Sequence, residues 1–182
     1  MIVYLGWGSL VWQPRALPMA GGWREDGPSV RVEFLRQSEN GRLTLVLTPE
    51  AAPVPSFWTA FAGEGRILEA REALGDREGV RPRNIERHIG VWTPGAADPA
   101  GVPGLNHWAA RRGITAVLWT ALPPKFDGRN GEVAQLEQVI AYLAGLTGEQ
   151  RQRAEEYIRR APSQIATNYR RYIEQRLGWT PI

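Results

Sequence analysis

Close to residue 131 the spacing of apolar residues changes from mostly alternating to helical for the rest of the chain. Before that point, segments such as 29–37 and 42–48 carry apolar residues at alternate positions, which is typical of strands with one buried face. After it, apolar residues recur at helical spacing in three segments. Strands that come first and helices that come last predict an α+β fold or a small barrel with a helical appendage.

We expect a single domain, 1–182, in which residues 1–122 form the β core and residues 131–178 form the helical appendage. A short helix at 65–74 is expected to end at Gly75 as its C-cap, and a helical turn is expected within 106–112. Strands are predicted at residues 2–5, 29–37, 42–48, 56–62, 86–92 and 114–120.

Two short motifs predict local geometry. Asn40 and Gly41 between two alternating segments predict a hairpin with a type I′ turn, in which both central residues have positive φ angles. Thr147 followed by Gln150 predicts a capping box at the start of the second C-terminal helix.

Composition limits the classes of protein to consider. The 182 residues are 43% hydrophobic and 23% charged, without cysteine, so disulfides and thiolate chemistry are excluded. No apolar run reaches the roughly 18–20 residues that span a bilayer, and no signal peptide is visible, so we expect a cytoplasmic protein with no membrane partner. The net charge is only +3 and acidic residues alternate with arginines, so we expect no nucleic-acid partner.

The first predicted strand runs into a glycine-rich loop made of Gly6, Trp7, Gly8, Ser9 and Leu10. Glycines allow positive φ angles and let the backbone approach a ligand closely. Successive N–H groups in such a turn can converge on an anion. The loop is therefore a candidate site for a small anionic ligand, and the alternative is a plain strand-to-loop turn.

Three known glycine motifs do not fit this loop. A dinucleotide fingerprint needs a third glycine and a helix start, where the chain has Val11 and Pro14. A phosphate-binding P-loop ends in Gly-Lys-Ser/Thr, and no lysine is near. A nucleophile elbow needs a glycine two residues after Ser9, which argues against a Ser-His-Asp triad built on it.

Glu78 is the candidate acid. It follows the predicted helix at 65–74 and precedes Gly79, where a loop can aim a carboxylate inward. The alternative is a solvated loop acid, which the neighbouring charges of Asp76 and Arg77 favour.

Together, the two stretches resemble the gamma-glutamylcyclotransferase superfamily. The family carries a Tyr-Gly-Ser loop after its first strand, which residues 7–9 resemble, and a catalytic glutamate in a Leu-x-x-x-Glu-Gly segment, which residues 74–80 resemble. The resemblance covers about the first 120 residues and implies a small mixed β-barrel. The chain has Trp7 where the family has the loop tyrosine, and Asn84 near where many members carry another tyrosine.

The resemblance implies release of 5-oxoproline from a small gamma-glutamyl compound, as in glutathione metabolism, by an internal acyl transfer that makes the protein a lyase or transferase. The substrate's α-amine would attack its own side-chain carbonyl, with Glu78 as the acid and base, a role that burial favours by raising a carboxylate's pKa. The backbone N–H groups of residues 7–10 would hold the substrate carboxylate or the developing oxyanion. No metal and no cofactor are implied.

Other candidate features have simpler explanations. His88 and His107 are too isolated for a zinc site and are expected to be structural. Arginines and glutamates alternate along residues 149–176, which predicts a solvated, salt-bridged face. The alternatives are a contact surface for a partner subunit, as in a homodimer, or for an anionic ligand. A non-catalytic anion-binding or protein-interaction module of the same fold is the alternative to an enzyme.

Overall fold

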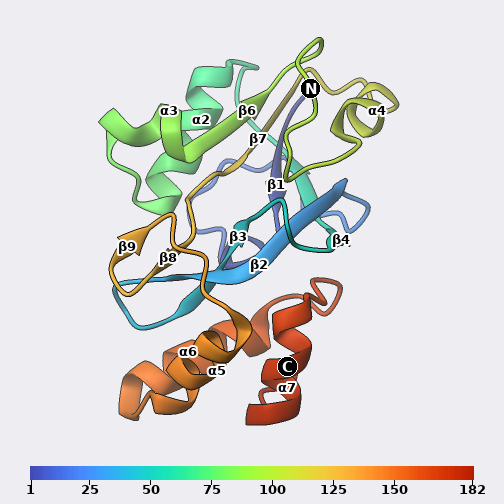
Figure 1. Cartoon of the computed structure of the whole chain (residues 1–182). Helices are drawn as coiled ribbons and strands as arrows, with labels where there is room; N and C mark the ends of the chain where they lie inside the picture. The colour runs from blue at the N-terminus through green and yellow to red at the C-terminus, as the bar shows by residue number, and fades with distance from the viewer.

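A four-stranded mixed sheet is built around the first strand of the chain. The computed structural model describes residues 1–182 (Figure 1). In this sheet β1 is parallel to β7 on one side and antiparallel to β5 on the other, and β6 adds to β7 in antiparallel fashion. All five residues of β1 are buried, as expected of an unbroken apolar run in a central strand. The strands are β1 (Ile2–Gly6), β5 (Phe57–Ala60), β6 (Ile89–Trp92) and β7 (Ala116–Thr120).

The second sheet is also mixed and is built around a long hairpin. Its central strand β2 pairs antiparallel with β3 and β4 and parallel with β8, which pairs with β9. Its members are β2 (Ser29–Gln37), β3 (Leu43–Leu47), β4 (Pro53–Pro55), β8 (Lys125–Phe126) and β9 (Arg129–Asn130).

The turn between β2 and β3 differs from the type I′ turn predicted. Only Gly41 has a positive φ, 76°, whereas Asn40 does not. The Gly41 N–H donates to the Ser38 carbonyl at 3.0 Å and the Ser38 N–H donates to the Arg42 carbonyl at 2.8 Å. The hairpin therefore has a three-residue loop that ends in one left-handed glycine. An Asn-Gly sequence is compatible with this loop as well as with a two-residue type I′ turn.

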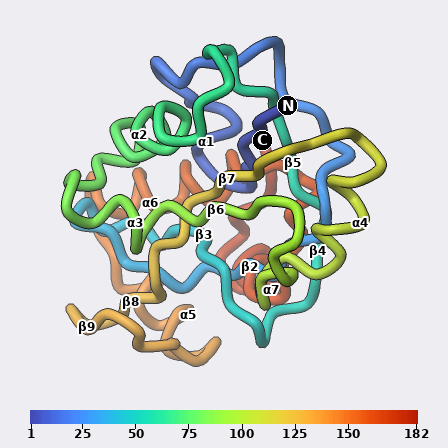
Figure 2. Tube along the Cα trace, turned by 90° about the horizontal axis from the view of Figure 1, so that it is seen from above, coloured from blue at the N-terminus to red at the C-terminus, as the bar shows by residue number.

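Short helices surround the first sheet. Helix α2 packs against it through Ala70 and Leu74, which belong to a separate core cluster of ten residues. In both views α2 and α4 lie on opposite sides of β1 (Figures 1 and 2). The segments are α1 (Ser9–Trp12), α2 (Ile67–Glu78), the 3₁₀ turn Pro82–Asn84, α3 (Ile85–His88) and α4 (Leu105–Ala110).

Two predicted boundaries in this region are wrong. Helix α2 does not end at Gly75 but continues to Glu78, and Gly79, with φ 67°, caps it. Gly75 is instead a packing glycine, because a Cβ there would lie 3.1 Å from Ile85 Cγ1. The strand expected from residue 86 begins only at Ile89, after the helical turn α3.

Three C-terminal helices pack beneath the second sheet: α5 (Leu136–Gly145), α6 (Gly148–Arg160) and α7 (Asn168–Leu177) (Figure 1). Their apolar faces join the strands in a single cluster of 32 buried residues, so the helices share one core with the strands. Buried Glu33 of β2 accepts the Tyr169 N–H of α7 at 3.1 Å. Arg170, 2% exposed, donates to the Ala161 and Pro162 carbonyls at 2.7 Å.

The cap of α6 differs from the prediction. Thr147 is its N-cap residue but its side chain makes no capping hydrogen bond. A capping box occurs one helix earlier, between Gln135 and Gln138 of α5.

The α+β class predicted from the order of strands and helices is confirmed. The β part consists of two curled mixed sheets, one of them a half-barrel, with strands contributed from both halves of the chain. No helix in the structure combines the length and the apolarity needed to cross a membrane.

Candidate active site

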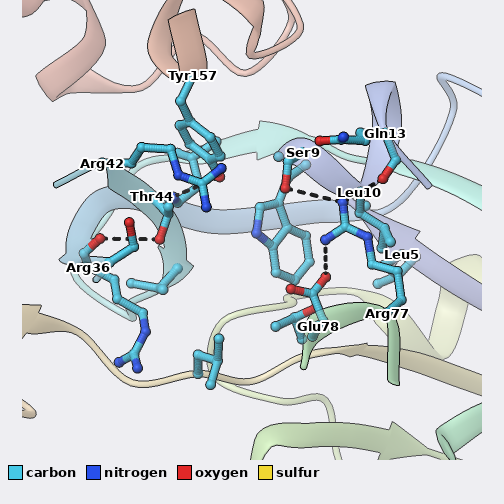
Figure 3. A pocket seen from close by; sticks show the side chains of 18 of the residues that line it. Leu5, Ser9, Leu10, Gln13, Arg36, Arg42, Thr44, Arg77, Glu78 and Tyr157 are labelled. Atoms are coloured by element: carbon cyan, nitrogen blue, oxygen red, sulfur yellow. Dashed lines mark hydrogen bonds and ion pairs between the residues drawn. The ribbon is translucent and has the colours of Figure 1, made fainter. Parts of the chain in front are cut away.

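A cavity of about 220 Å³ lies where the first loop, the β2–β3 hairpin, the end of α2 and helix α6 meet (Figure 3). All five residues of the glycine-rich loop line it, and so does Glu78. The structure therefore brings together the two segments that the sequence singled out. Eight further charged or hydroxyl-bearing residues line the wall: Arg15, Arg36, Ser38, Arg42, Thr44, Arg77, Thr120 and Tyr157.

The two glycines of the loop are required for space, not for positive φ angles. Neither Gly6 nor Gly8 has a positive φ. A Cβ on Gly6 would lie 2.9 Å from the Trp23 ring, and a Cβ on Gly8 would lie 2.7 Å from the Tyr157 hydroxyl oxygen. From Ser9 onward the loop continues into the single helical turn α1, which the sequence did not predict and which ends at Gln13.

Glu78 is not a solvated loop acid. It is the last residue of α2, and its side chain is 16% exposed. Its Oε1 accepts a hydrogen bond from Arg77 Nη1 at 2.7 Å, while Oε2 has no partner in the protein. One carboxylate oxygen is thus held in place by Arg77, and the other is left without a protein partner in a residue that lines the cavity.

Arg77 links the two halves of the site. Its side chain is 7% exposed, and its Nη2 donates to Ser9 Oγ at 3.2 Å and to the Gln13 carbonyl at 2.7 Å (Figure 3). One guanidinium therefore fixes both the acid and the loop. Sequence reasoning treated Arg77 as a sign of solvent exposure. Its spacing from Leu74, one helical turn before it on a buried face, was the available signal that it turns inward.

Tyr157 reaches the cavity from α6. Its hydroxyl accepts the Leu45 N–H at 3.4 Å and donates to no protein group. Burial raises the pKa of Tyr157 to about 12, and the nearby Glu78 charge adds to this, while N–H groups of Leu45 and Ser9 and the Arg42 charge oppose it. The hydroxyl therefore keeps its proton at neutral pH. The sequence predicted only an inward-facing aromatic here.

The walls of the cavity carry more positive than negative charge. Four arginines line it against the single carboxylate of Glu78. Burial lowers the pKa of Arg36, which donates to the Pro123 carbonyl at 2.8 Å. Three buried polar atoms of the lining residues have no hydrogen-bond partner, namely Ser38 Oγ, Arg42 Nε and Arg77 Nε. Buried groups of this kind are normally paired, so they are candidates for contact with a ligand.

The arrangement offers a carboxylate base, a neutral hydroxyl donor and cationic walls, which suit an anionic substrate that exchanges protons. No group of three His, Asp or Glu side chains is placed to hold a metal ion. His88 and His107, which the sequence suggested are structural, do not line this cavity.

Comparisons with known proteins add no family to this description. No protein-family model matches the chain, and no similar curated protein or solved structure was found. The function of the cavity is therefore inferred from its own residues and geometry.

Proposed function

We propose that this chain is a gamma-glutamylcyclotransferase-like enzyme that releases 5-oxoproline from a small gamma-glutamyl compound. The observation that carries the proposal is that Glu78 and the loop of residues 6–10, which are remote in sequence, line one cavity. The same observation supports the finer assignment of the two curled sheets to a gamma-glutamylcyclotransferase-like barrel.

The proposed reaction is an internal aminolysis. The substrate's α-nitrogen attacks its γ-carbonyl carbon, a ring C–N bond forms, and the C–N bond to the leaving amine breaks. Glu78 accepts a proton from the α-ammonium group and delivers it to the leaving nitrogen. Over the whole reaction two protons pass from the α-nitrogen to the leaving amine, so the atoms balance without water or an oxidant.

Tyr157 is the proposed donor to the carbonyl oxygen. Its hydroxyl accepts a hydrogen bond from the Leu45 N–H and donates none to any protein group. A buried, neutral donor aimed at the site of developing charge stabilises an oxyanion more than it stabilises the starting carbonyl. In this assignment α6 supplies a hydroxyl that the family resemblance places elsewhere, near Asn84.

Cavity size supports a small substrate. At about 220 Å³, the cavity is below the roughly 300–1,000 Å³ of pockets that hold drug-sized ligands. A single glutamyl group, bound close to Glu78, suits this volume.

The test is 5-oxoproline release from γ-glutamylalanine by the wild-type protein, the Glu78→Gln variant and the Glu72→Gln variant. Glu72 is exposed on the same helix and has no polar partner, so it is a matched control. We expect Glu78→Gln to lower kcat by about 10²–10⁴-fold, the usual effect of an acid–base group, and Glu72→Gln to leave it unchanged. Full activity in Glu78→Gln would remove Glu78 from the mechanism.

A non-catalytic anion-binding module is the second candidate. The observation that favours it is the Arg77–Glu78 pair, which leaves three lining arginines without a carboxylate of the site. This function predicts no 5-oxoproline from any gamma-glutamyl compound, together with glutamate binding that titration calorimetry detects and that Glu78→Gln strengthens.

A further inference from the structure

A carboxyl group without a basic partner is buried between β2 and the start of α7. Glu33 is 5% exposed and lies opposite Val46 in the β2–β3 ladder. Its Oε1 accepts hydrogen bonds from the Thr167 hydroxyl and, at 2.9 Å, from the Phe34 N–H, and its Oε2 accepts the Tyr169 N–H at 3.1 Å. Glu33 does not line the candidate active site, so the proposed reaction does not use it.

These hydrogen bonds fix the N-terminus of α7 to the second sheet. Thr167 is the N-cap residue of this ten-residue helix, and its hydroxyl oxygen also accepts the Arg170 N–H at 3.2 Å. Glu33 therefore meets the cap and the free N–H groups at the positive end of the helix dipole. No other hydrogen bond joins β2 to α7, so one acid supplies the acceptors for the whole polar contact between them.

The charged groups around Glu33 are engaged elsewhere. Strands β3 and β4 carry no titratable residue. Lys125 of β8 lies beside Arg36, three residues farther along β2. The Arg170 guanidinium of α7 donates to backbone carbonyls of the preceding loop and to Glu174. The basic side chains of β2 itself donate to backbone carbonyls, namely those of Arg31 and Arg36. A carboxylate at this position is therefore buried without an opposite charge, which is unfavourable.

The protonation of Glu33 reflects this burial. Burial raises the pKa of Glu33, and the hydrogen bonds from Thr167 and from three backbone N–H groups oppose the rise. Tyr169 is the other titratable group that faces it. The Tyr169 hydroxyl donates to the Ala134 carbonyl at 3.1 Å, and burial, followed by the Glu33 charge, raises the pKa of Tyr169, so this group stays neutral near pH 7.

The sign of the pH effect follows from linkage. Below pH 4.5, the ordinary pKa of a glutamate, Glu33 is protonated whether α7 is docked on β2 or not. As the pH rises, the undocked state ionises first, because its carboxyl group is solvated. The docked state is therefore progressively weakened until the buried carboxyl group ionises as well.

We propose that Glu33 is a pH-sensitive latch, whose protonation holds the N-terminus of α7 on β2 and whose ionisation lets α7 open locally. The latch is a property of the fold and does not depend on the proposed reaction. It lies one residue from the wall of the candidate site, since the Phe34 ring meets the Tyr157 ring edge-on with their centroids 6.4 Å apart.

Hydrogen exchange followed by mass spectrometry tests the latch in the full chain. Exchange is measured at about pH 5 and about pH 7.5 and corrected for the intrinsic pH dependence of amide exchange, so that protection reports local opening. We expect the protection of residues 168–177 to fall by about 10-fold over this range, the change that a pKa one unit above the ordinary value provides. Helix α2 packs in a separate core cluster, so its protection should stay the same.

Two outcomes of this measurement would overturn the latch. One is protection of α7 that does not change with pH. The other is an equal fall in α2, because the pH effect would then act on global unfolding and not on the docking of one helix.

Glu33→Gln assigns the effect to one carboxyl group, because it removes the titration and keeps the shape of the side chain. Protection of α7 in this variant should be the same at both pH values, whatever its absolute level. Glu50→Gln is the matched control, since Glu50 is an exposed glutamate that also accepts a threonine hydroxyl, that of Thr48. This control should keep the wild-type fall, and a fall of wild-type size in Glu33→Gln would overturn the inference.

A pair of variants at Thr167 tests the latch even if Glu33→Gln does not fold. Thr167→Val removes a hydrogen bond that stabilises the ionised carboxylate, so the fall in α7 protection should continue to a higher pH than in the wild type. Thr167→Ser keeps the hydroxyl and should behave as the wild type does. The same pH range for the fall in Thr167→Val and in the wild type would show that Glu33 is not the group that titrates.

Discussion

Gly8 and Tyr157 are so close that a Cβ added to Gly8 would lie 2.7 Å from the Tyr157 hydroxyl oxygen, although the next ring atom is 3.7 Å away. The loop after the first strand and the sixth helix are therefore fitted to each other at one point. We expect Gly8→Ala to displace the hydroxyl, with a loss of about 1–3 kcal/mol in the free energy of unfolding, as overpacking costs. Urea unfolding measures this.

A double-mutant cycle makes the prediction specific to the hydroxyl. In a Tyr157→Phe background the clashing oxygen is absent, so Gly8→Ala should cost clearly less there than in the wild type. Gly22→Ala is the control, since no atom lies within 4 Å of a Cβ at that position. Its effect should stay within about 0.5 kcal/mol. Additive effects of Gly8→Ala and Tyr157→Phe would show that the Tyr157 hydroxyl is not the reason why a side chain at residue 8 is destabilising.

Tyr157→Phe alone tests the hydroxyl as a donor. The buried Leu45 N–H loses its acceptor, and an unsatisfied buried donor costs about 1–3 kcal/mol; the lower end applies because the bond is 3.4 Å long. We expect kcat for 5-oxoproline release to fall by about 10²-fold, as for the loss of one oxyanion donor. An unchanged kcat would show that the hydroxyl does not serve the reaction.

The same variant changes the pH dependence of stability. The pKa of Tyr157 is raised from 10.0 to about 12 in the folded protein. Below pH 10 both states keep the proton, whereas between pH 10 and 12 only the unfolded state releases it, so this contribution to stability is lost as pH rises. The free energy of unfolding should therefore fall less steeply between pH 10 and 12 in Tyr157→Phe than in the wild type. Equal slopes would contradict the burial of the hydroxyl.

How much the sequence could predict is seen by comparing β2 with α2. The strand at residues 29–37 matches the prediction because its alternating pattern ends at a glycine-containing turn on one side and at Pro28 on the other. The predicted helix ends too early, at Gly75, because a glycine after an apolar helical segment is typical of a C-cap. In the structure Gly75 is required for close packing against Ile85, which is a tertiary contact that no local pattern contains.

The candidate site also depends on tertiary contacts that a local sequence pattern does not contain. Local signals, an acid beside a glycine and a pair of glycines after a strand, mark Glu78 and the first loop as separate candidates, and only the family resemblance implied that they meet, as they do at one cavity. Arg77 and Tyr157 were missed because their roles depend on partners far along the chain. Ser9 is bound by Arg77, and Leu45 by Tyr157. A helical stripe predicts that Tyr157 is buried but not where its hydroxyl ends.

Arg77 is predicted to position Glu78 and the loop together. Arg77→Lys keeps the positive charge, but a single ammonium lacks the fork that reaches Glu78 Oε1 and Ser9 Oγ at once. We expect kcat for 5-oxoproline release to fall by about 10²-fold with a smaller change in KM, because misplacing a catalytic group by about 1 Å has this effect. Steady-state kinetics on γ-glutamylalanine measures both constants.

Arg66→Lys is the control for this variant. Arg66 forms an exposed ion pair with Glu69 at the other end of the same helix, so the substitution should leave kcat, KM and stability unchanged.

Arg77→Gln should also lower the free energy of unfolding, by about 3 kcal/mol, because it leaves the largely buried Glu78 carboxylate unpaired. Wild-type kcat in Arg77→Lys would mean that Glu78 is oriented without the fork.

Gly79 determines where the helix that carries Glu78 ends. Its φ of 67° lies in the left-handed region, and its N–H donates to the Asp76 carbonyl at 3.1 Å. Because a Cβ there meets no atom within 4 Å, the cost of a substitution is conformational and not steric. We expect Gly79→Ala to destabilise the protein by about 1 kcal/mol, and Gly79→Asn by less, since asparagine tolerates this conformation.

Gly145→Ala is expected to stabilise the protein, in contrast to Gly79→Ala. This exposed glycine is the last residue of α5, has no positive φ and also meets no atom within 4 Å. Alanine there should raise the free energy of unfolding by up to about 0.5 kcal/mol, because it restricts the unfolded chain without strain in the folded one.

Equal costs for alanine and asparagine at Gly79 would mean that the left-handed φ of Gly79 is not the cause of the destabilisation. The backbone at the end of α2 would then be free to rearrange, and the orientation of Glu78 would depend on the Arg77 ion pair alone.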